Sequence, residues 1–148
     1  MLALLAGPAA AAFDLNEVTL GASEQQIKGK FPEANCRALE WPSRAAERRC
    51  DDSRIKVGGI DASVTFYLKQ NAVEGFDLRF EKAQLERMTK FLLERYGKPA
   101  AQKGDALGTM IEWKAKGERA RLTAEQGRRR ASLLVWRGAF EDEIYKVR

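Results

Sequence analysis

The clearest pattern in this chain is an alternation of apolar and polar residues over positions 60–69. Its apolar members are Ile60, Ala62, Val64, Phe66 and Leu68. Successive side chains of a β-strand point to opposite faces of the sheet, so this spacing predicts a strand with one face in the core and one toward solvent. After a turn at Gln70-Asn71, residues 73–80 repeat the alternation, which predicts an antiparallel partner.

Five further segments have the composition of strands and lie between turn-forming residues. They span 36–41, 48–57, 110–115, 118–124 and 129–136. The expected tight turns are Gly58-Gly59, Lys116-Gly117 and Gln126-Gly127. Connections this short predict that strands consecutive in the sequence pair with each other in antiparallel fashion.

Two segments have helical spacing instead. Ser23 and Gln26 form a capping-box sequence before a short helix that ends at Pro32. A second helix is predicted from an apolar stripe that Gly97 ends: Leu85, Met88, Leu92 and Tyr96. For residues 140–148 the pattern leaves a terminal helix and a terminal strand both open.

The order of these elements predicts an α+β fold, α-β-β-β-β-α-β-β-β, with the helices packed on one face of the sheet. It consists of two tandem units, each a helix followed by an antiparallel meander, over about 13–80 and 81–137. Residues 13–148 are enough for a single domain with one core and leave little room for a second domain.

Residues 1–12 have the composition of the end of a secretory signal peptide. An apolar run, Leu2–Ala6, is followed by Gly7-Pro8 and by Ala10-Ala11-Ala12, which predicts cleavage just before Phe13. We therefore expect export, most simply to a bacterial periplasm. The basic stretch that opens such signals would lie upstream of Met1, and a buried N-terminal helix is the alternative interpretation.

The same segment does not predict attachment to a membrane. A spanning helix needs about 20 apolar residues, and the run here is much shorter. No cysteine ends the run, so lipidation at a lipoprotein site is not supported either.

The two cysteines, Cys36 and Cys50, are expected to form a disulfide in an exported chain. Closing a loop of this size stabilises a fold by about 3 kcal/mol in the chain-entropy model. A redox or metal-binding role is the alternative, although the spacing differs from the Cys-x-x-Cys of redox sites.

The net charge of +5 is concentrated in one block. Residues 13–97 are balanced, whereas residues 98–137 contain ten basic and four acidic side chains. The candidate binding residues in this block are Arg119, Arg121, Arg128, Arg129, Arg130, Trp113 and Trp136. Arginine forks suit carboxylate and phosphate groups, and the indoles could add apolar contact. A solvated sheet face whose charges discourage aggregation explains the same pattern without a ligand.

The composition gives little support to catalysis. The chain has no histidine, which removes the commonest general base and metal ligand, and it contains no cofactor motif. Asp51-Asp52 and Glu141-Asp142-Glu143 are the carboxylate groupings left for acid–base chemistry, and neighbours in a strand point to opposite faces. We therefore expect a protein without enzymatic activity, cofactor or metal.

Several of these features together resemble a known group of exported proteins. They are Phe13-Asp14-Leu15, the run Val18-Thr19-Leu20-Gly21 before Ser23, the short helix, the cysteine pair in the next hairpin and the Gly-Lys-Pro after the second helix. The chain resembles the beta-lactamase inhibitor proteins and the small outer-membrane assembly lipoproteins. The resemblance implies a protein-binding scaffold of tandem helix-plus-sheet units and places Cys36 and Cys50 at the bridge of the first unit. The cysteines of a second unit and the lipoprotein cysteine are missing.

The predicted function is thus a non-enzymatic periplasmic protein-binding module. The alternative is a protein that binds an envelope polyanion through a basic sheet surface. The expected partner is an envelope protein or an anionic envelope component. Neither nucleic acid nor a membrane-spanning role is expected.

Overall fold

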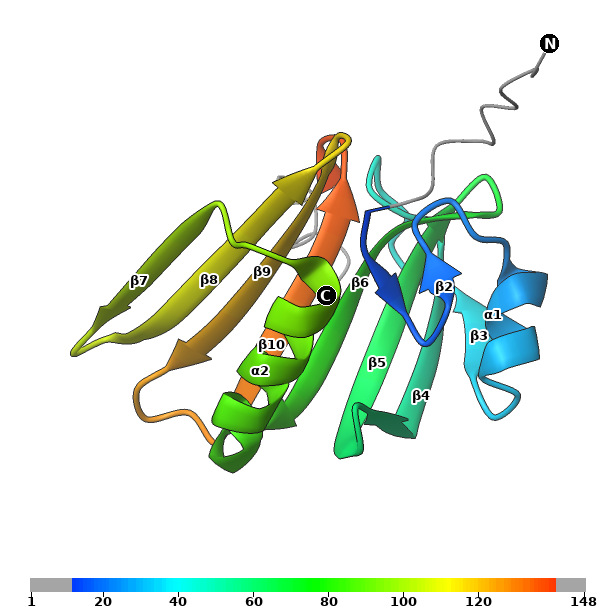
Figure 1. The fold of residues 1–148 in the computed structure, drawn as a ribbon. Coiled ribbons are helices and arrows are strands. Elements are labelled where there is room, and N and C mark those ends of the chain that lie inside the picture. The colour runs from blue at the N-terminus through cyan, green and yellow to red at the C-terminus, as the bar shows by residue number, and fades with distance from the viewer. Residues whose placement is uncertain (1–11, 141–148) are drawn as a thin grey trace, which may run out of the picture.

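The computed structural model describes residues 12–140, which form a large antiparallel sheet with two short helices (Figure 1). The predicted signal segment, apart from Ala12, and the tail 141–148 lie outside the described residues. The elements in chain order are β1 (Asp14–Leu15), β2 (Val18–Thr19), α1 (Glu24–Lys30), β3 (Asn35–Ala38), β4 (Arg48–Val57), β5 (Ile60–Lys69), β6 (Ala72–Glu81), the 3-10 turn η1 (Lys82–Gln84), α2 (Leu85–Tyr96), β7 (Ala101–Asp105), β8 (Gly108–Ala115), β9 (Glu118–Glu125) and β10 (Arg130–Arg137).

The predicted fold class, α+β with two helix-then-meander units, is wrong. Strands β3 to β10 form one eight-stranded sheet in the order β3-β4-β5-β6-β10-β9-β8-β7, with every pair antiparallel. The two meanders share this sheet because β6 and β10 pair along their length, from Glu81 opposite Arg130 to Gly75 opposite Trp136. Helices α1 and α2 are only 7 and 12 residues long, so the described part of the chain is mainly β.

One hydrophobic core lies between the sheet and the two helices. Ile27 of α1 and Met88 and Leu92 of α2 are buried in the same cluster as the inward residues of both meanders. Phe66 of β5, for example, packs against the end of α1, because its ring centre lies 5.4 Å from that of Phe31, the residue that caps this helix. Both helices therefore cover one face of the sheet, and the opposite face, here called the open face, has no helix over it in the described chain (Figure 1).

The sequence patterns located the long strands and both helices but missed three strands. Strand β7 has five exposed residues and no apolar alternation, so nothing in its composition marks it. Strands β1 and β2 have two residues each and are joined by a turn in which Asn16 and Glu17 adopt positive φ. Such a turn is usually marked by glycine, and this one has none.

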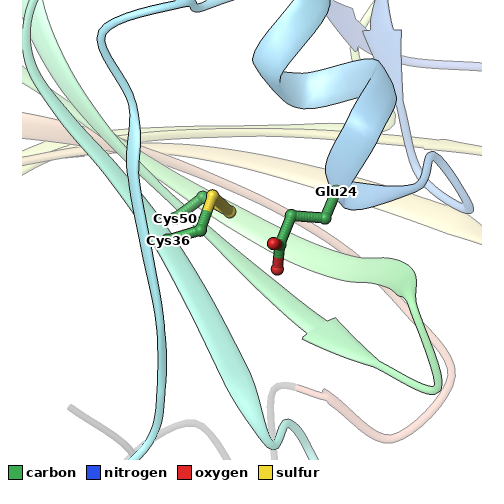
Figure 2. A group of neighbouring side chains, drawn as sticks. All are labelled: Glu24, Cys36 and Cys50. Atoms are coloured by element: carbon green, nitrogen blue, oxygen red, sulfur yellow. A yellow bond between two sulfur atoms is a disulfide. The ribbon is translucent and has the colours of Figure 1, made fainter.

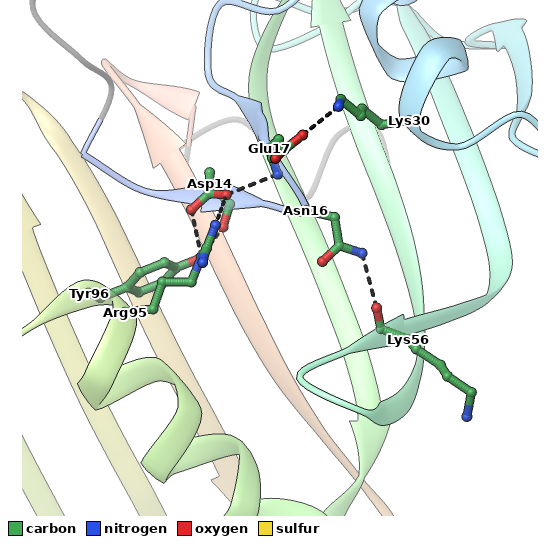
Figure 3. A network of polar contacts seen from close by, with 7 residues as sticks. All are labelled: Asp14, Asn16, Glu17, Lys30, Lys56, Arg95 and Tyr96. Atoms are coloured by element: carbon green, nitrogen blue, oxygen red, sulfur yellow. Dashed lines mark hydrogen bonds and ion pairs between the residues drawn. The ribbon is translucent and has the colours of Figure 1, made fainter.

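The β1–β2 hairpin lies against the sheet between the helices and connects distant parts of the chain (Figure 3). Asp14 accepts two hydrogen bonds from the Arg95 guanidinium of α2, at 2.9 and 2.5 Å. Asn16 donates to the carbonyl oxygen of Lys56 at 3.0 Å, and Glu17 pairs with Lys30 of α1. The hairpin thus holds both helices and the β4–β5 turn by polar contacts.

The contact between Asp14 and Arg95 should make stability depend on acid pH. Burial raises the pKa of Asp14. The hydrogen bond and charge of Arg95 and the N–H of Glu17 lower it by a larger amount, so the net pKa lies below its usual value. A group with a depressed folded-state pKa stabilises the fold above its unfolded pKa of about 3.9, and that contribution is lost as the pH falls.

Arg95→Gln is therefore expected to lower the free energy of unfolding at pH 7 by up to about 1 kcal/mol, because the pair is partly exposed. The difference from the parent protein should shrink as the pH falls below about 4, because Asp14 is protonated first in the unfolded chain and only at lower pH in the folded protein. Urea unfolding at pH 7 and pH 3 measures both values, with Arg87→Gln on the same helix as the control. A difference that is the same at both pH values would contradict the pairing.

Candidate functional site

The open face of the sheet carries polar and charged side chains in rows that cross several strands. One row follows the strand register through Asp51, Thr65, Asp77, Leu134, Arg121 and Glu112. Arg49 donates two hydrogen bonds to Asp51, at 2.8 and 2.6 Å, and Thr65 donates a third at 2.6 Å. On β4 and β5 this row is therefore a network of hydrogen-bonded polar side chains.

Asp51 and Asp52 do not form a catalytic pair in this arrangement. Burial raises the pKa of Asp51, but the hydrogen bonds from Arg49 and Thr65 outweigh it, so the net pKa is below its usual value. Asp52 is buried and accepts the backbone N–H of Arg54 at 3.1 Å. Each carboxylate has its own partner, and the acidic group Glu141-Asp142-Glu143 lies outside the described residues.

Arg121 and Trp136 lie together on the open face, where Trp136 is only 2% exposed and so offers almost no surface to a ligand. The guanidinium carbon of Arg121 is 4.9 Å from the centre of the Trp136 ring, and its Nε is 3.3 Å from a carboxylate oxygen of Glu112. Arg119 is exposed opposite Trp136 in the register. Because Arg121 is stacked and ion-paired, it contributes first to holding β8, β9 and β10 together.

A hollow of about 630 Å³ lies at the carboxyl end of β9, beside the turn that connects β9 to β10. Its basic lining residues are Arg79, Arg128, Arg129 and Arg130. Glu81 and Glu125 line it as well and approach Arg129 and Arg128 at 4.0 and 3.6 Å. These pairs are long and well exposed, so they leave the guanidinium groups available to a ligand.

A second hollow of about 620 Å³ adjoins the first and shares Arg79, Glu81 and Arg130 with it. It adds Arg54 and Lys56 from β4 and Asp61 from β5. We call the two hollows together the arginine trough, defined by Arg54, Arg79, Arg128, Arg129 and Arg130.

Charge in the arginine trough is not balanced. Six basic and three acidic side chains line the two hollows. Within residues 12–140, the guanidinium groups of Arg54 and Arg130 have no hydrogen-bond or ion-pair partner. Arg79, in contrast, is held at 3.1 Å by the buried carboxylate of Asp77. The trough therefore combines one anchored arginine with two unpaired ones.

The structure separates residues that the sequence analysis grouped. Arg128, Arg129 and Arg130 belong to the arginine trough, whereas Arg119 and Arg121 lie toward the opposite end of β9. Trp113 is on the helix-covered face, is 1% exposed and donates its indole N–H to the carbonyl oxygen of Gly97 at 2.9 Å. It is a core residue and cannot contact a ligand on the open face.

Sequence reasoning missed Arg54 and Arg79 as site residues. Arg79 lies on the polar side of an alternating strand, which predicts its facing, but the pairing of β6 with β10 brings it beside Arg130. Arg54 lies within an irregularity in the pairing of β4 with β5, between Asp52 and Ile55, so alternation could not predict the direction of its side chain.

Cys36 and Cys50 form the predicted disulfide (Figure 2). They lie directly opposite each other on β3 and β4, and the bridge attaches the edge strand to the sheet. A carboxylate oxygen of Glu24 lies close to both sulfurs, but Glu24 accepts a hydrogen bond from Arg48 at 2.8 Å. Sulfurs joined in a disulfide are not thiolate ligands, so the three residues do not form a metal site in this state.

Comparison with known protein families, curated proteins and solved structures finds no match. The resemblance to the inhibitor proteins and assembly lipoproteins therefore stays a prediction. Among the helices in residues 12–140, none has the length and apolar composition needed to cross a bilayer.

Proposed function

We propose that this protein is a non-enzymatic binding protein of the bacterial envelope, and that its arginine trough binds a polyanion carrying phosphate groups. The observation that supports the proposal is the pair of adjoining hollows lined by Arg54, Arg79, Arg128, Arg129 and Arg130, two of which have no anionic partner in the described chain. The proposal keeps the expected envelope location but changes the residues of the site.

The chemistry of the lining suits phosphate groups. A guanidinium presents several N–H donors in a planar fork and binds phosphate oxygens in pairs. Hydroxyl groups of Ser63, Thr123 and Ser132 lie among the arginines and can donate to the remaining oxygens. Because the hollows adjoin at Arg79 and Arg130, a ligand with repeated anionic groups can occupy both.

The shape of the site favours a chain-like ligand over an acidic protein surface. Stable protein interfaces need roughly 800 Å² on each partner with a well-packed apolar centre. The first hollow of the trough has Ala131 as its one hydrophobic lining residue. Ile55 and Phe80 line the second hollow but are only 8% and 2% exposed, so the trough offers little apolar surface to a partner. Its charge instead provides attraction that depends on salt, as in other electrostatic binding surfaces.

The test is direct binding of an inorganic polyphosphate chain. The variant Arg54→Ser/Arg129→Ser/Arg130→Ser removes three trough charges and keeps Arg79, which pairs with the buried Asp77 carboxylate and so supports the sheet as well as the site. We expect its Kd to rise at least about tenfold and its salt dependence to weaken, because three charged contacts are lost. Isothermal titration at three salt concentrations measures both quantities.

The matched control is Lys90→Ser/Lys98→Ser/Arg119→Ser, which removes the same charge from exposed positions outside the trough. It should bind within about threefold of the parent protein, since each loss is remote from the ligand. Equal weakening in both variants would show that only net charge matters and would overturn the site. Tighter binding of polyglutamate than of polyphosphate would assign the trough to an acidic protein.

A protein partner is the second candidate, and Trp41 favours it. This side chain is 74% exposed in the β3–β4 connection, whose Leu39, Ala45 and Ala46 are buried in a small second cluster on the open-face side. Exposed tryptophans held on an anchored loop are frequent centres of protein interfaces. Partner binding that persists in high salt and is lost in Trp41→Ala would support this candidate over the polyanion.

A further inference from the structure

Phe13, the second residue of the described chain, is held in place by contacts with distant elements. The Phe13 side chain is 2% exposed, and its ring centre lies 4.9 Å from that of Tyr96. The backbone N–H of Phe13 donates to a carboxylate oxygen of Glu118, at the start of β9, with a distance of 3.3 Å. Two elements remote in the sequence, α2 and β9, therefore contact this one residue.

The next residue is held just as firmly. Tyr96 donates its hydroxyl proton to the carbonyl oxygen of Asp14 at 2.8 Å, and the Asp14 carboxylate is paired with Arg95 (Figure 3). Since the backbone on the carboxyl side of Phe13 cannot shift freely, the Phe13 nitrogen is kept beside Glu118.

We propose that Glu118 binds the mature amino terminus, which forms when the Ala12–Phe13 peptide bond is hydrolysed. Water adds across that bond, so Ala12 leaves as a carboxylate and the Phe13 nitrogen becomes a primary ammonium group. The nitrogen that carries the new charge already lies 3.3 Å from the Glu118 oxygen. This inference rests on the expected export processing and is independent of the arginine trough.

The charges around Phe13 support an ion pair at this place. The ionisable groups that face it are Asp14 from β1, Arg95 and Tyr96 from α2 and Glu118 from β9. Arg95 is neutralised by Asp14, and burial raises the pKa of Tyr96, which stays uncharged. Glu118 is thus the anion left to interact with an ammonium group.

The pH dependence of the pair has a definite sign. An α-amino group has a pKa of about 7.7–8.0 in an unfolded chain, and a neighbouring carboxylate raises it in the folded state. The stabilisation is complete below the unfolded pKa and is lost as the pH rises through the folded pKa. This loss on the alkaline side is distinct from the acid effect of Asp14.

The test uses the exported, processed protein and its Glu118→Gln variant. Intact mass should show that both chains begin at Phe13. Isotopic dimethylation of the α-amine and its NMR titration then give the pKa of the amino terminus. We expect a value at least about half a unit above 8.0 in the parent protein and a return toward 7.7–8.0 in the variant.

Two outcomes would overturn the proposal. One is an amino-terminal pKa that is the same in the parent protein and in Glu118→Gln, with both folded by circular dichroism. The other is a mature chain that begins at a residue other than Phe13. Glu118→Asp, which keeps the charge on a shorter side chain, should give an intermediate pKa and shows that charge, rather than the residue's shape, is responsible.

Discussion

Replacing Trp113 with alanine is expected to lower the free energy of unfolding by about 3–5 kcal/mol, the range for large aromatic residues removed from a core. Trp113 is 1% exposed, and its ring meets that of Tyr96 edge-on at 5.7 Å. Its indole N–H also supplies the hydrogen bond to the carbonyl of Gly97, the residue that ends α2. Urea unfolding followed by circular dichroism measures the loss.

Trp113→Phe serves as the control, because it keeps an aromatic ring and removes the indole N–H. We expect a smaller loss than for alanine, since less volume is removed. Binding of polyphosphate by the folded fraction should be unchanged in Trp113→Phe. An alanine variant that is as stable as the parent protein but binds polyphosphate more weakly would contradict the core assignment and would indicate that Trp113 contacts the ligand.

The second large effect is expected from removing the disulfide. The double variant Cys36→Ala/Cys50→Ala should lose about 3 kcal/mol of unfolding free energy, as expected for a loop of this length in the chain-entropy model. Strand β3 has no fully buried residue and pairs with β4 at only four positions, so the bridge reinforces a short edge strand that has few other contacts. Urea unfolding of oxidised parent and variant gives the difference.

Chemical reduction of the parent protein provides an independent comparison. Reduced parent and double variant should unfold at similar urea concentrations, because each lacks the same constraint. A double variant as stable as the oxidised parent would mean that β3 is held without the bridge.

The sequence predicts the fold well wherever one face of a strand is buried. Alternation over residues 60–69 located β5, and the turn pairs at Gln70-Asn71 and Lys116-Gly117 both adopt the positive φ that such hairpin turns require. Strand β7 has neither face buried, so it leaves no pattern in the sequence. Local patterns also do not show which distant strands pair, and the β6–β10 pairing decided the fold class.

The site was harder to predict for the same reason. The run Arg128–Arg130 is visible as charge in the sequence, but Arg54 and Arg79 reach it only through the sheet. Arg121 looks equally available in the sequence, yet stacking on Trp136 and pairing with Glu112 engage it. Whether an arginine is free depends on long-range partners, which composition does not reveal.

The pairing of β6 with β10 also has a consequence for the order of folding. Every other strand pair in the large sheet joins strands consecutive in the chain, whereas β6 meets β10 only after α2 and three strands have intervened. Closing a long loop costs conformational entropy before its contacts can form. We therefore expect each meander to form faster than the β6–β10 pairing that joins them. Pairing of β6 with β10 is then the step that combines two locally formed meanders into one cooperative sheet.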